Sequence, residues 1–260
     1  MNFPLTVIHP EAKVGNNVTI DPFAVIEKDV VIGDNTHIFS HTVILNGARI
    51  GRNCNIFPGA VIAGIPQDLK FKGETTTVEI GEDTTIRECA TVNRGTASKG
   101  RTIIGNHCFI MAYSHIAHDC VVKDHVIIGN ASQIAGEVEI DDYAIVSGGS
   151  LVHQFTRISK HVMIQGGSRI GKDIPPYTLI GREPIAYCGI NIVGLRRRGF
   201  TNEQVYLIQD IYRTLYTRGL NNKDALKCIE TEYEPSVERD LILDFIKSSN
   251  RGIVRGSIDE

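Results

Sequence analysis

Residues 104–128 read IGNHCFIMAYSHIAHDCVVKDHVII, and every sixth position is isoleucine or valine. The same spacing runs from Ile8 to Ile62, returns at Ile80, Ile86 and Val92, and continues from Ile104 to Ile170. A helix repeats every 3.6 residues and a flat strand every two, so neither produces a period of six. A solenoid of short strands with a corner every six residues does, and its stacked coils bury the aliphatic side chains. The spacing therefore predicts a parallel β-helix.

A second position, four residues after each aliphatic, holds small side chains that suit a tight corner. It includes Ala12, Ala24, Thr36, Ala48, Cys54, Cys108 and Cys120. Gly15, Gly33 and Gly51 recur at a spacing of 18, which is three hexapeptides or one three-sided coil. Glycine adopts positive φ without strain, so we expect these glycines to supply that conformation at the corners.

Two segments interrupt the repeat and return to it in phase: residues 63–77 and residues 94–101. Insertions in solenoids are commonly loops on one face, which is often the binding face. The first insertion places Asp68 and Lys70 beside Leu69 and Phe71, a composition that favours an ordered loop. For the second, a solvated loop without a role is an equally good interpretation.

The period changes to helical near the C-terminus. Pro175 and Pro176 end the regular coils, and residues 177–200 read as a linker. Thr201 with Gln204 predicts a capping box that opens a helix to about residue 218. Helices follow over residues 222–232 and after Pro235 and Ser236. The predicted organisation is an all-β solenoid over residues 1–176, a linker over 177–200 and a small α-helical domain over 201–260.

Composition narrows the class of protein. The net charge is −3, so no global charge points to nucleic acid or to an anionic membrane surface. No apolar run approaches the roughly 18 residues of a membrane span, and Met1 to Lys13 do not resemble a signal peptide. The six cysteines form no CxxC pair, which favours a reduced, cytoplasmic protein.

The segment from His115 to Cys120 (HIAHDC) carries the most chemistry. Ile116 and Cys120 occupy interior positions, so His115, His118 and Asp119 are expected outside the prism. An imidazole titrates near neutrality, and a neighbouring carboxylate can hold it in one tautomer, so this group suits proton transfer. Three ordinary surface residues, or metal ligation by the histidines, are the alternatives.

Other short segments give this one a context. They are QDLK at 67–70, AG at 135–136, VHQF at 152–155, HVM at 161–163 and GINIVGLRRRGF at 189–200. Together with HIAHDC they resemble the bacterial UDP-N-acetylglucosamine O-acyltransferase family over nearly the whole chain. The resemblance implies a left-handed parallel β-helix, a homotrimer, and a cytoplasmic enzyme that uses neither cofactor nor metal. It implies the first step of lipid A (lipopolysaccharide) biosynthesis, in which the sugar 3-hydroxyl attacks a 3-hydroxyacyl thioester on acyl carrier protein.

The resemblance also implies roles for individual residues. His118 would be the general base, Asp119 would orient its ring, and the Gly136 N–H would stabilise the oxyanion. A glycine at Gly166 would leave the acyl groove open to a long chain. Sugar and acyl contacts fall on Asp68, Lys70, His115, His153 and Gln154, and nucleotide contacts on Asn191, Arg197 and Arg198.

Three positions depart from the family pattern: Asn93 and Glu137 stand where histidine is frequent, and Val193 replaces an acidic residue. They bear on recognition of the phosphates, acyl chain and uridine, and leave the base and the oxyanion donor in place. Because the carrier is acidic, Lys223, Lys227 and Arg239 are candidates for its docking, with an indifferent solvated face as the alternative.

Three other functions fit parts of the pattern. An N-acyltransferase of the same pathway shares the coils and a histidine, but normally has an extra N-terminal domain, whereas the repeats here begin by Ile8. A zinc carbonic anhydrase on the same solenoid would use histidines such as His115, His118 and His125 as ligands. A non-catalytic scaffold would carry its histidines incidentally.

Overall fold

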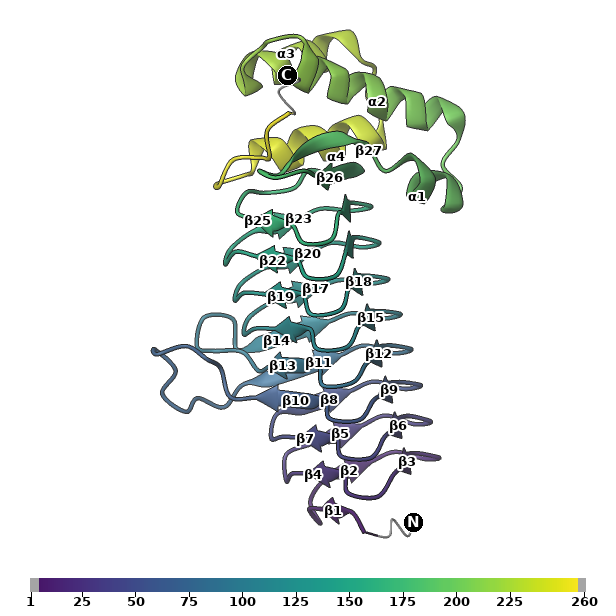
Figure 1. Cartoon of the computed structure of the whole chain (residues 1–260), viewed down its shortest axis with the longest axis vertical. Coiled ribbons are helices and arrows are strands. Elements are labelled where there is room, and N and C mark those ends of the chain that lie inside the picture. The colour runs from purple at the N-terminus through teal and green to yellow at the C-terminus, as the bar shows by residue number, and fades with distance from the viewer. Residues whose placement is uncertain (1–4, 257–260) are drawn as a thin grey trace.

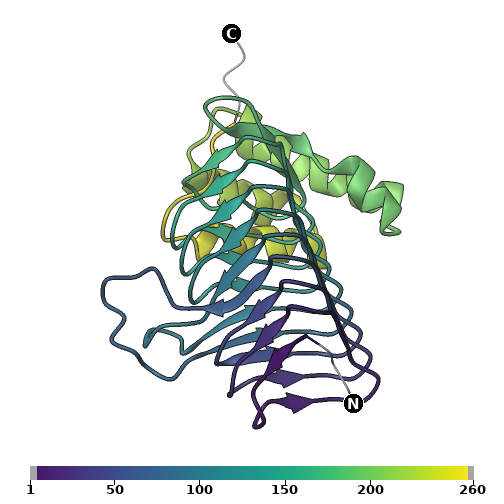
Figure 2. The same cartoon turned by 60° about the horizontal axis from the view of Figure 1, so that its bottom comes forward.

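The computed structural model describes residues 5–256, and it is a three-sided rod with helices at one end (Figure 1). Seen obliquely from the N-terminal end, the coils stack as triangles (Figure 2). Residues 1–4 and 257–260 lie outside the described range. The first four belong to the segment that was compared with a signal peptide, and the last four to the expected helical domain.

Three parallel sheets form the sides, and each takes one strand from nearly every coil. The first holds β1 Val7–Ile8, β4 Val25–Ile26, β7 Val43–Ile44, β10 Val61–Gly64, β13 Thr91–Asn93, β16 His115–Ile116, β19 Gln133–Ile134, β22 Leu151–Val152 and β25 Arg169–Ile170. The second holds β2 Lys13–Val14, β5 Val31–Ile32, β8 Ala48–Ile50, β11 Thr77–Ile80, β14 Arg101–Ile104, β17 Val121–Val122, β20 Glu139–Ile140 and β23 Arg157–Ile158. The third holds β3 Thr19–Ile20, β6 His37–Ile38, β9 Asn55–Ile56, β12 Thr85–Ile86, β15 Phe109–Ile110, β18 Ile127–Ile128, β21 Ile145–Val146, β24 Met163–Ile164, β26 Thr178–Gly181 and β27 Ala186–Ile190.

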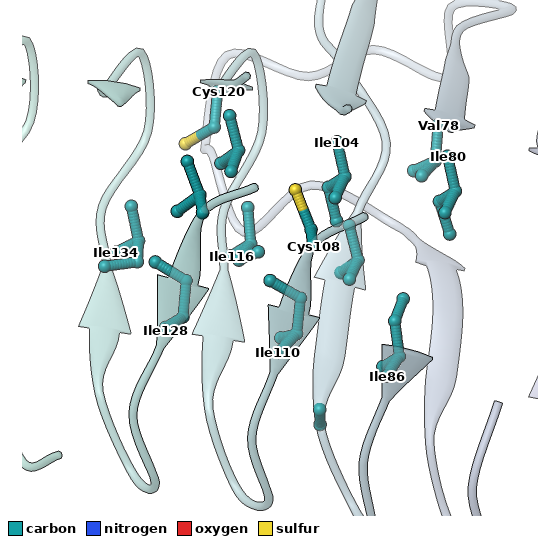
Figure 3. Close-up of a cluster of buried hydrophobic side chains, with 14 of the residues drawn as sticks. Val78, Ile80, Ile86, Ile104, Cys108, Ile110, Ile116, Cys120, Ile128 and Ile134 are labelled. Atoms are coloured by element: carbon teal, nitrogen blue, oxygen red, sulfur yellow. The ribbon is translucent and has the colours of Figure 1, made fainter. Parts of the chain in front are cut away.

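The six-residue series fills the centre of the prism. Ile26 pairs with Ile44 in the next coil, and Ile116 pairs with Ile134. Each side therefore stacks residues 18 apart where no loop intervenes, and the aliphatic at every level from Ile20 onward is buried (Figure 3). Cys108 and Cys120 pack in the same interior, as the small-residue position predicts. Burial of each isoleucine side chain stabilises the coil by about 1.5–3 kcal/mol.

The repeating glycines are required for a different reason from the one expected. Gly15, Gly33 and Gly51 do not have positive φ; that conformation falls two residues later, at Asn17, Asn35 and Asn53. A Cβ on Gly33 would lie 2.7 Å from the carbonyl carbon of Gly51 in the next coil. These positions exclude side chains because stacked backbones leave no room, so the expectation about φ was wrong.

Both insertions leave the rod at the same edge, after a strand of the first sheet (Figures 1 and 2). Despite them, Ile62 pairs with Val92 and Val92 pairs with Ile116. The register is kept because the aliphatic side chains must remain inside the prism. The two loops therefore cover one corner of neighbouring coils.

The segment expected to be a linker, 177–200, is folded. β26 continues the third sheet, β27 pairs with it antiparallel, and helix α1 (Ile192–Arg197) follows. Pro175 and Pro176 end the hexapeptide repeat without ending the sheet. Sequence reading missed these strands because they leave the six-residue period and have no alternation of their own.

The later helices agree with their predicted positions. α2 is Asn202–Thr217 with a capping box between Thr201 and Gln204, α3 is Asn222–Glu232, and α4 is Val237–Lys247 with Ser236 as its N-cap. They enclose a second core around Tyr212. The chain then returns to the last coil, where Ile253 bridges to Asp173. No helix within residues 5–256 has the length and apolar character needed to cross a membrane.

Candidate active site

His118 and Asp119 lie in the turn between β16 and β17, where Asp119 contacts the second loop and His118 lies across from Asp68 of the first. The flanking Ile116 and Cys120 are fully buried in the prism, so the turn between them projects outward. Asp119 has a φ of 60°, and its carboxylate meets the loop that follows β13 in the preceding coil. Both side chains are nevertheless covered: His118 is 8% exposed and Asp119 is fully buried. They are therefore not ordinary surface residues.

The imidazole of His118 is held on one side by a carboxylate. Its Nδ1 lies 2.8 Å from Asp119 Oδ2. The N–H of Thr96 (2.9 Å) and the N–H of Lys99 (3.1 Å) donate to Oδ1, and the Thr96 hydroxyl (2.6 Å) donates to Oδ2. Burial acts to raise the pKa of Asp119, but the hydrogen bonds from Thr96, His118 and Lys99 outweigh it and hold that pKa below its usual value. The ionised carboxylate keeps the proton of His118 on Nδ1 and leaves the Nε2 lone pair available.

The open side of the ring faces a glycine. A Cβ built on Gly136 would lie 2.6 Å from both Cε1 and Nε2 of His118, so any side chain there would displace the imidazole. The N–H of Gly136 donates to no protein acceptor within the described chain. A residue without a side chain thus lies against the reactive nitrogen, and its main-chain N–H is left free for a ligand.

His115 lies three residues before His118 on the same coil, in β16. Its Nδ1 is 2.7 Å from the Thr91 hydroxyl. Burial, with a smaller effect of His118, lowers the pKa of His115, so its imidazole is neutral at pH 7. It can therefore hydrogen-bond a polar ligand without adding charge next to His118.

A groove of about 630 Å³ runs along the first sheet from this corner. Five predicted residues line it: His115, His118, Gly136, His153 and Gln154. Residues that sequence reasoning missed also line it: Gln67, Gln133, Leu151 and Arg169. The last three follow His115 at a spacing of 18, the signal that could have revealed them. The groove is mainly apolar, which suits an acyl chain.

Asp68, on the first loop, lies across from the His118 ring. Its Oδ2 is 3.9 Å from His118 Nε2, and its Oδ1 accepts from the N–H of Lys70 at 2.9 Å. Lys70 itself is exposed. The amide of Asn93 donates to the carbonyl of Ile65 at 3.0 Å and so ties the loop to the coil. The loop is ordered by these bonds, in agreement with its composition.

Four other predicted residues lie away from the groove in the single chain. Gly166 is in the turn after β24, beside the carbonyl of Gly148, at a different corner of the prism. Asn191 caps α1 and donates to the His161 carbonyl at 2.9 Å. Arg197 is exposed, and Arg198 lies 5.1 Å from the Tyr143 ring centroid. One chain does not bring these residues to His118.

Cys120 adjoins the site but cannot act in it as a nucleophile. Its thiol donates to the Ala135 carbonyl at 3.1 Å inside the prism. Burial raises the pKa of Cys120 to about 12, so it remains a thiol at neutral pH. The chemistry of this corner therefore rests on the imidazole and carboxylate.

Two family models match the chain. The model for the second domain of UDP-N-acetylglucosamine O-acyltransferases matches residues 173–254, and the bacterial transferase hexapeptide model matches residues 11–46, 29–64 and 101–136. An acyl-[acyl-carrier-protein]–UDP-N-acetylglucosamine O-acyltransferase from Chlorobium phaeobacteroides is 60% identical over 247 residues, covering 95% of this chain and 94% of the relative. The chain belongs to the UDP-N-acetylglucosamine O-acyltransferase family.

Solved structures of the UDP-N-acetylglucosamine acyltransferase family agree with the fold. The protein from Bacteroides fragilis superposes with a TM-score of 0.97 at 56% identity, covering 98% of this chain and all of that one. The protein from Francisella novicida gives 0.96 at 42% identity, covering 99% and 95%. The predicted left-handed parallel β-helix with a C-terminal helical region is confirmed.

The family assignment bears on one alternative function, and the position of His125 bears on another. The matched family model and the Chlorobium phaeobacteroides relative are both named as O-acyltransferases, which removes the support for the N-acyltransferase interpretation. His125 does not join His115 and His118; its ring stacks between His107 and Tyr143 at another corner, with centroids 4.7 and 4.5 Å away. The three histidines of the zinc interpretation therefore do not converge within this chain.

The departures from the family pattern have local explanations in two cases. Asn93 anchors the first loop, as described above. Glu137 accepts a hydrogen bond from the Ser98 hydroxyl and pairs with Lys99, so it holds the second loop. Val193 is exposed on α1, and nothing in the structure explains its replacement of an acidic residue.

Proposed function

We propose that this chain transfers a 3-hydroxyacyl group from acyl carrier protein to the 3-hydroxyl of UDP-N-acetylglucosamine, the first step of lipid A biosynthesis. The observation that carries the proposal is the geometry at His118: one ring nitrogen is fixed by a buried carboxylate and the other faces an apolar groove. Family membership supports the same reaction. A sugar hydroxyl is a poor nucleophile at neutral pH, so this reaction needs such a base.

His118 Nε2 accepts the proton of the 3-hydroxyl as the sugar oxygen bonds to the thioester carbon. The carbonyl oxygen becomes an oxyanion, which the Gly136 N–H stabilises by typically about 3 kcal/mol. The C–S bond then breaks, and the departing thiolate of the carrier takes the proton back from His118. Because Cys120 is a buried thiol, no acyl-cysteine intermediate is involved, and transfer is direct.

Substrate contacts are assigned from the first loop and from the walls of the groove. Asp68 and Lys70 on the first loop would bind sugar hydroxyls, since Asp68 lies across from His118 Nε2. Neutral His115 would hydrogen-bond the sugar or the acyl carbonyl. His153 and Gln154 would position the 3-hydroxyacyl chain farther along the groove.

The direct test of the reaction is an acyl-transfer assay with UDP-N-acetylglucosamine and 3-hydroxyacyl carriers of graded length. The proposal expects an O-acylated product and a long preferred chain, because Gly166 leaves space. Gly166→Met should shorten the preferred chain. Absence of transfer from every carrier would sink the reaction, whereas a clear preference for a short chain would sink only the role of Gly166.

The active enzyme is proposed to be a homotrimer in which a neighbouring subunit completes each site. The support is that Gly166, Asn191, Arg197 and Arg198 match ligand-binding positions but lie at a different corner from His118. Flat sides of the prism offer large surfaces for mutual burial. The two guanidinium groups would then reach the phosphates of the nucleotide bound beside His118 of the next subunit.

Subunit mixing tests this arrangement. His118→Ala and Arg198→Ala proteins are each expected to be inactive, but refolded together they should recover about a quarter of the wild-type activity, because mixed trimers contain one intact site. Each variant refolded alone is the control. No recovery from mixtures that form trimers, or a monomeric mass for the active wild-type enzyme, would refute the shared site.

The carrier protein is proposed to dock on α3. Lys223 and Lys227 lie beside a hollow between α3 and the end of α4. Arg239, the third candidate, is already bonded to Asp240 and to the Tyr233 carbonyl, so it is the least available. Charge reversal of Lys223 and Lys227 should raise KM for the carrier and leave KM for the sugar nucleotide unchanged. Lys28→Glu at the other end of the rod is the control.

The proposal also places the enzyme in the cytoplasm, where both substrates would be available. Its support is the sequence pattern of unpaired cysteines, which is typical of reducing compartments. Fractionation of cells expressing the natural chain would test it, and recovery in the periplasm would contradict it.

A further inference from the structure

The second loop, residues 94–100, closes directly over the catalytic carboxylate. Thr96 is 7% exposed although it belongs to a loop. The carboxylate accepts bonds on both oxygens, and Oδ2 is shared between two donors, the Thr96 hydroxyl and His118 Nδ1. The threonine hydroxyl thus meets the same oxygen atom that orients the base.

The direction of the Thr96 hydroxyl is fixed by a second bond. The N–H of Ser98 donates to Thr96 Oγ1 at 3.2 Å. Since this bond occupies a lone pair of the hydroxyl oxygen, its proton is left to point at Asp119. The main chain of Asp119 is held separately, because its N–H donates to Thr102 Oγ1 at 2.8 Å. The Thr96 hydroxyl therefore orients the Asp119 carboxylate, while Thr102 holds the main chain of the turn between β16 and β17.

The loop is tied down by the next coil. The Ser98 hydroxyl donates to Glu137 at 2.5 Å, and Lys99 Nζ lies 3.4 Å from Glu137 and 3.3 Å from Glu139. Glu137 occupies the position in its coil that Asp119 occupies in the preceding one. Two acidic residues on successive coils therefore hold the loop, one from beneath and one from the side.

We infer that Thr96 is a positioning residue of the acyl transfer, which orients the Asp119 carboxylate so that His118 keeps its proton on Nδ1 and presents Nε2 to the substrate. The second loop is thus part of the active site, which removes the interpretation of a solvated excursion. The inference rests on the proposed function, because it assigns Thr96 a role in the same reaction.

The charges around Asp119 set the expected pH dependence. His118 contacts Asp119, and Asp68 lies on the far side of the His118 ring. Lys99 is in the loop that covers Asp119, and it pairs with Glu137 and Glu139. After burial, the bond from Thr96 has the largest effect on the pKa of Asp119, and it lowers that pKa. Loss of the hydroxyl should therefore let Asp119 accept a proton at higher pH, and the acidic limb of kcat/KM should move upward.

The test compares Thr96→Val, Thr96→Ser and Thr36→Val in the full-length enzyme. Thr96→Val removes the hydroxyl at nearly constant shape, and kcat should fall about tenfold with KM little changed. Its acidic limb should lie at higher pH, and Thr96→Ser should restore both. Thr36 lies several coils away from Thr96. It is buried and its hydroxyl donates to the Gly51 carbonyl, so Thr36→Val controls for the loss of a buried hydroxyl.

The outcomes separate this inference from the proposed function. If the wild type transfers no acyl group, the proposed function fails. If the wild type is active and Thr96→Val keeps its kcat and pH profile, the role of Thr96 is refuted. A fall in kcat with an unmoved acidic limb, no rescue by serine, or an equal effect of Thr36→Val would mean general destabilisation and would also refute it. Thermal unfolding of each variant confirms that folded protein was compared.

Discussion

Asp119 and Asn35 occupy the same place in their hexapeptides, three residues after a buried isoleucine, with φ of 60° and 57°. Their backbones are nearly identical, but their surroundings are not. Asn35 is exposed and belongs to a ladder of amides, accepting from Asn17 and donating to Asn53 at 3.3 Å. Asp119 is fully buried beneath a loop and is bonded to the base. One corner is structural, and the other holds the catalytic group that we propose.

The difference lies in what covers the corner. Asparagine and aspartate both tolerate the left-handed conformation that a hexapeptide turn needs. Insertion of residues 94–100 after β13 then surrounds one such aspartate with donors, while a corner such as that of Asn35 remains exposed. The repeat supplies the position, and the loop supplies the electrostatics.

The sharpest way to break the comparison is to exchange the two side-chain types. Asp119→Asn should lower kcat by about 10²- to 10³-fold, because a neutral amide no longer holds the proton on His118 Nδ1. Asn35→Asp should leave kcat unchanged and disturb only the ladder. Steady-state kinetics on both proteins checks this; similar rates for the two would mean that the covered corner has no special role.

Two crowded glycines give the next contrast. Gly136→Ala should lower kcat about tenfold to a hundredfold, because the new methyl group displaces the His118 ring. Gly33→Ala meets backbone rather than a catalytic ring, so it should lower the unfolding temperature and leave the activity per folded molecule intact. Kinetics and thermal unfolding measured on the same samples decide it, and loss of activity in Gly33→Ala alone would reverse the assignment.

The smallest expected effect concerns acid stability. The pKa of Asp119 is lower in the folded chain than the usual aspartate value of about 3.9, so its stabilising contribution is complete above about pH 4 and is lost as pH falls through the folded value. The stability difference between wild type and Asp119→Asn should be constant from about pH 5 to 8 and shrink below about pH 4. Denaturant unfolding at several pH values measures it. A difference that grows toward low pH would contradict the ionised carboxylate.

Much of the fold follows from the sequence because it is local or periodic. Ile116 and Cys120 occupy the two positions of the hexapeptide that point into the prism. His118 and Asp119, which lie between them, had to be outside. The capping box at Thr201 defines the start of α2 within one residue. Neither inference requires knowledge of a distant contact.

The remaining features depend on contacts between coils or loops. The crowding that excludes side chains at Gly33 comes from the backbone of the next coil, which no local pattern reports. β27 reverses direction to pair with β26, so it lies outside the repeat. The bonds from Thr96 to Asp119 depend on how an irregular loop closes, and the proposed meeting of Gly166 or Arg198 with His118 would require a second subunit.

The most direct measurement is acyl transfer to UDP-N-acetylglucosamine by wild type and His118→Ala under identical conditions. The replaced side chain lies outside the prism, so the coils should still form, and thermal unfolding of the variant checks that folded protein is compared. We expect its kcat to fall about a thousandfold, as loss of a general base requires. A folded His118→Ala protein that transfers the acyl group at the wild-type rate would contradict the account.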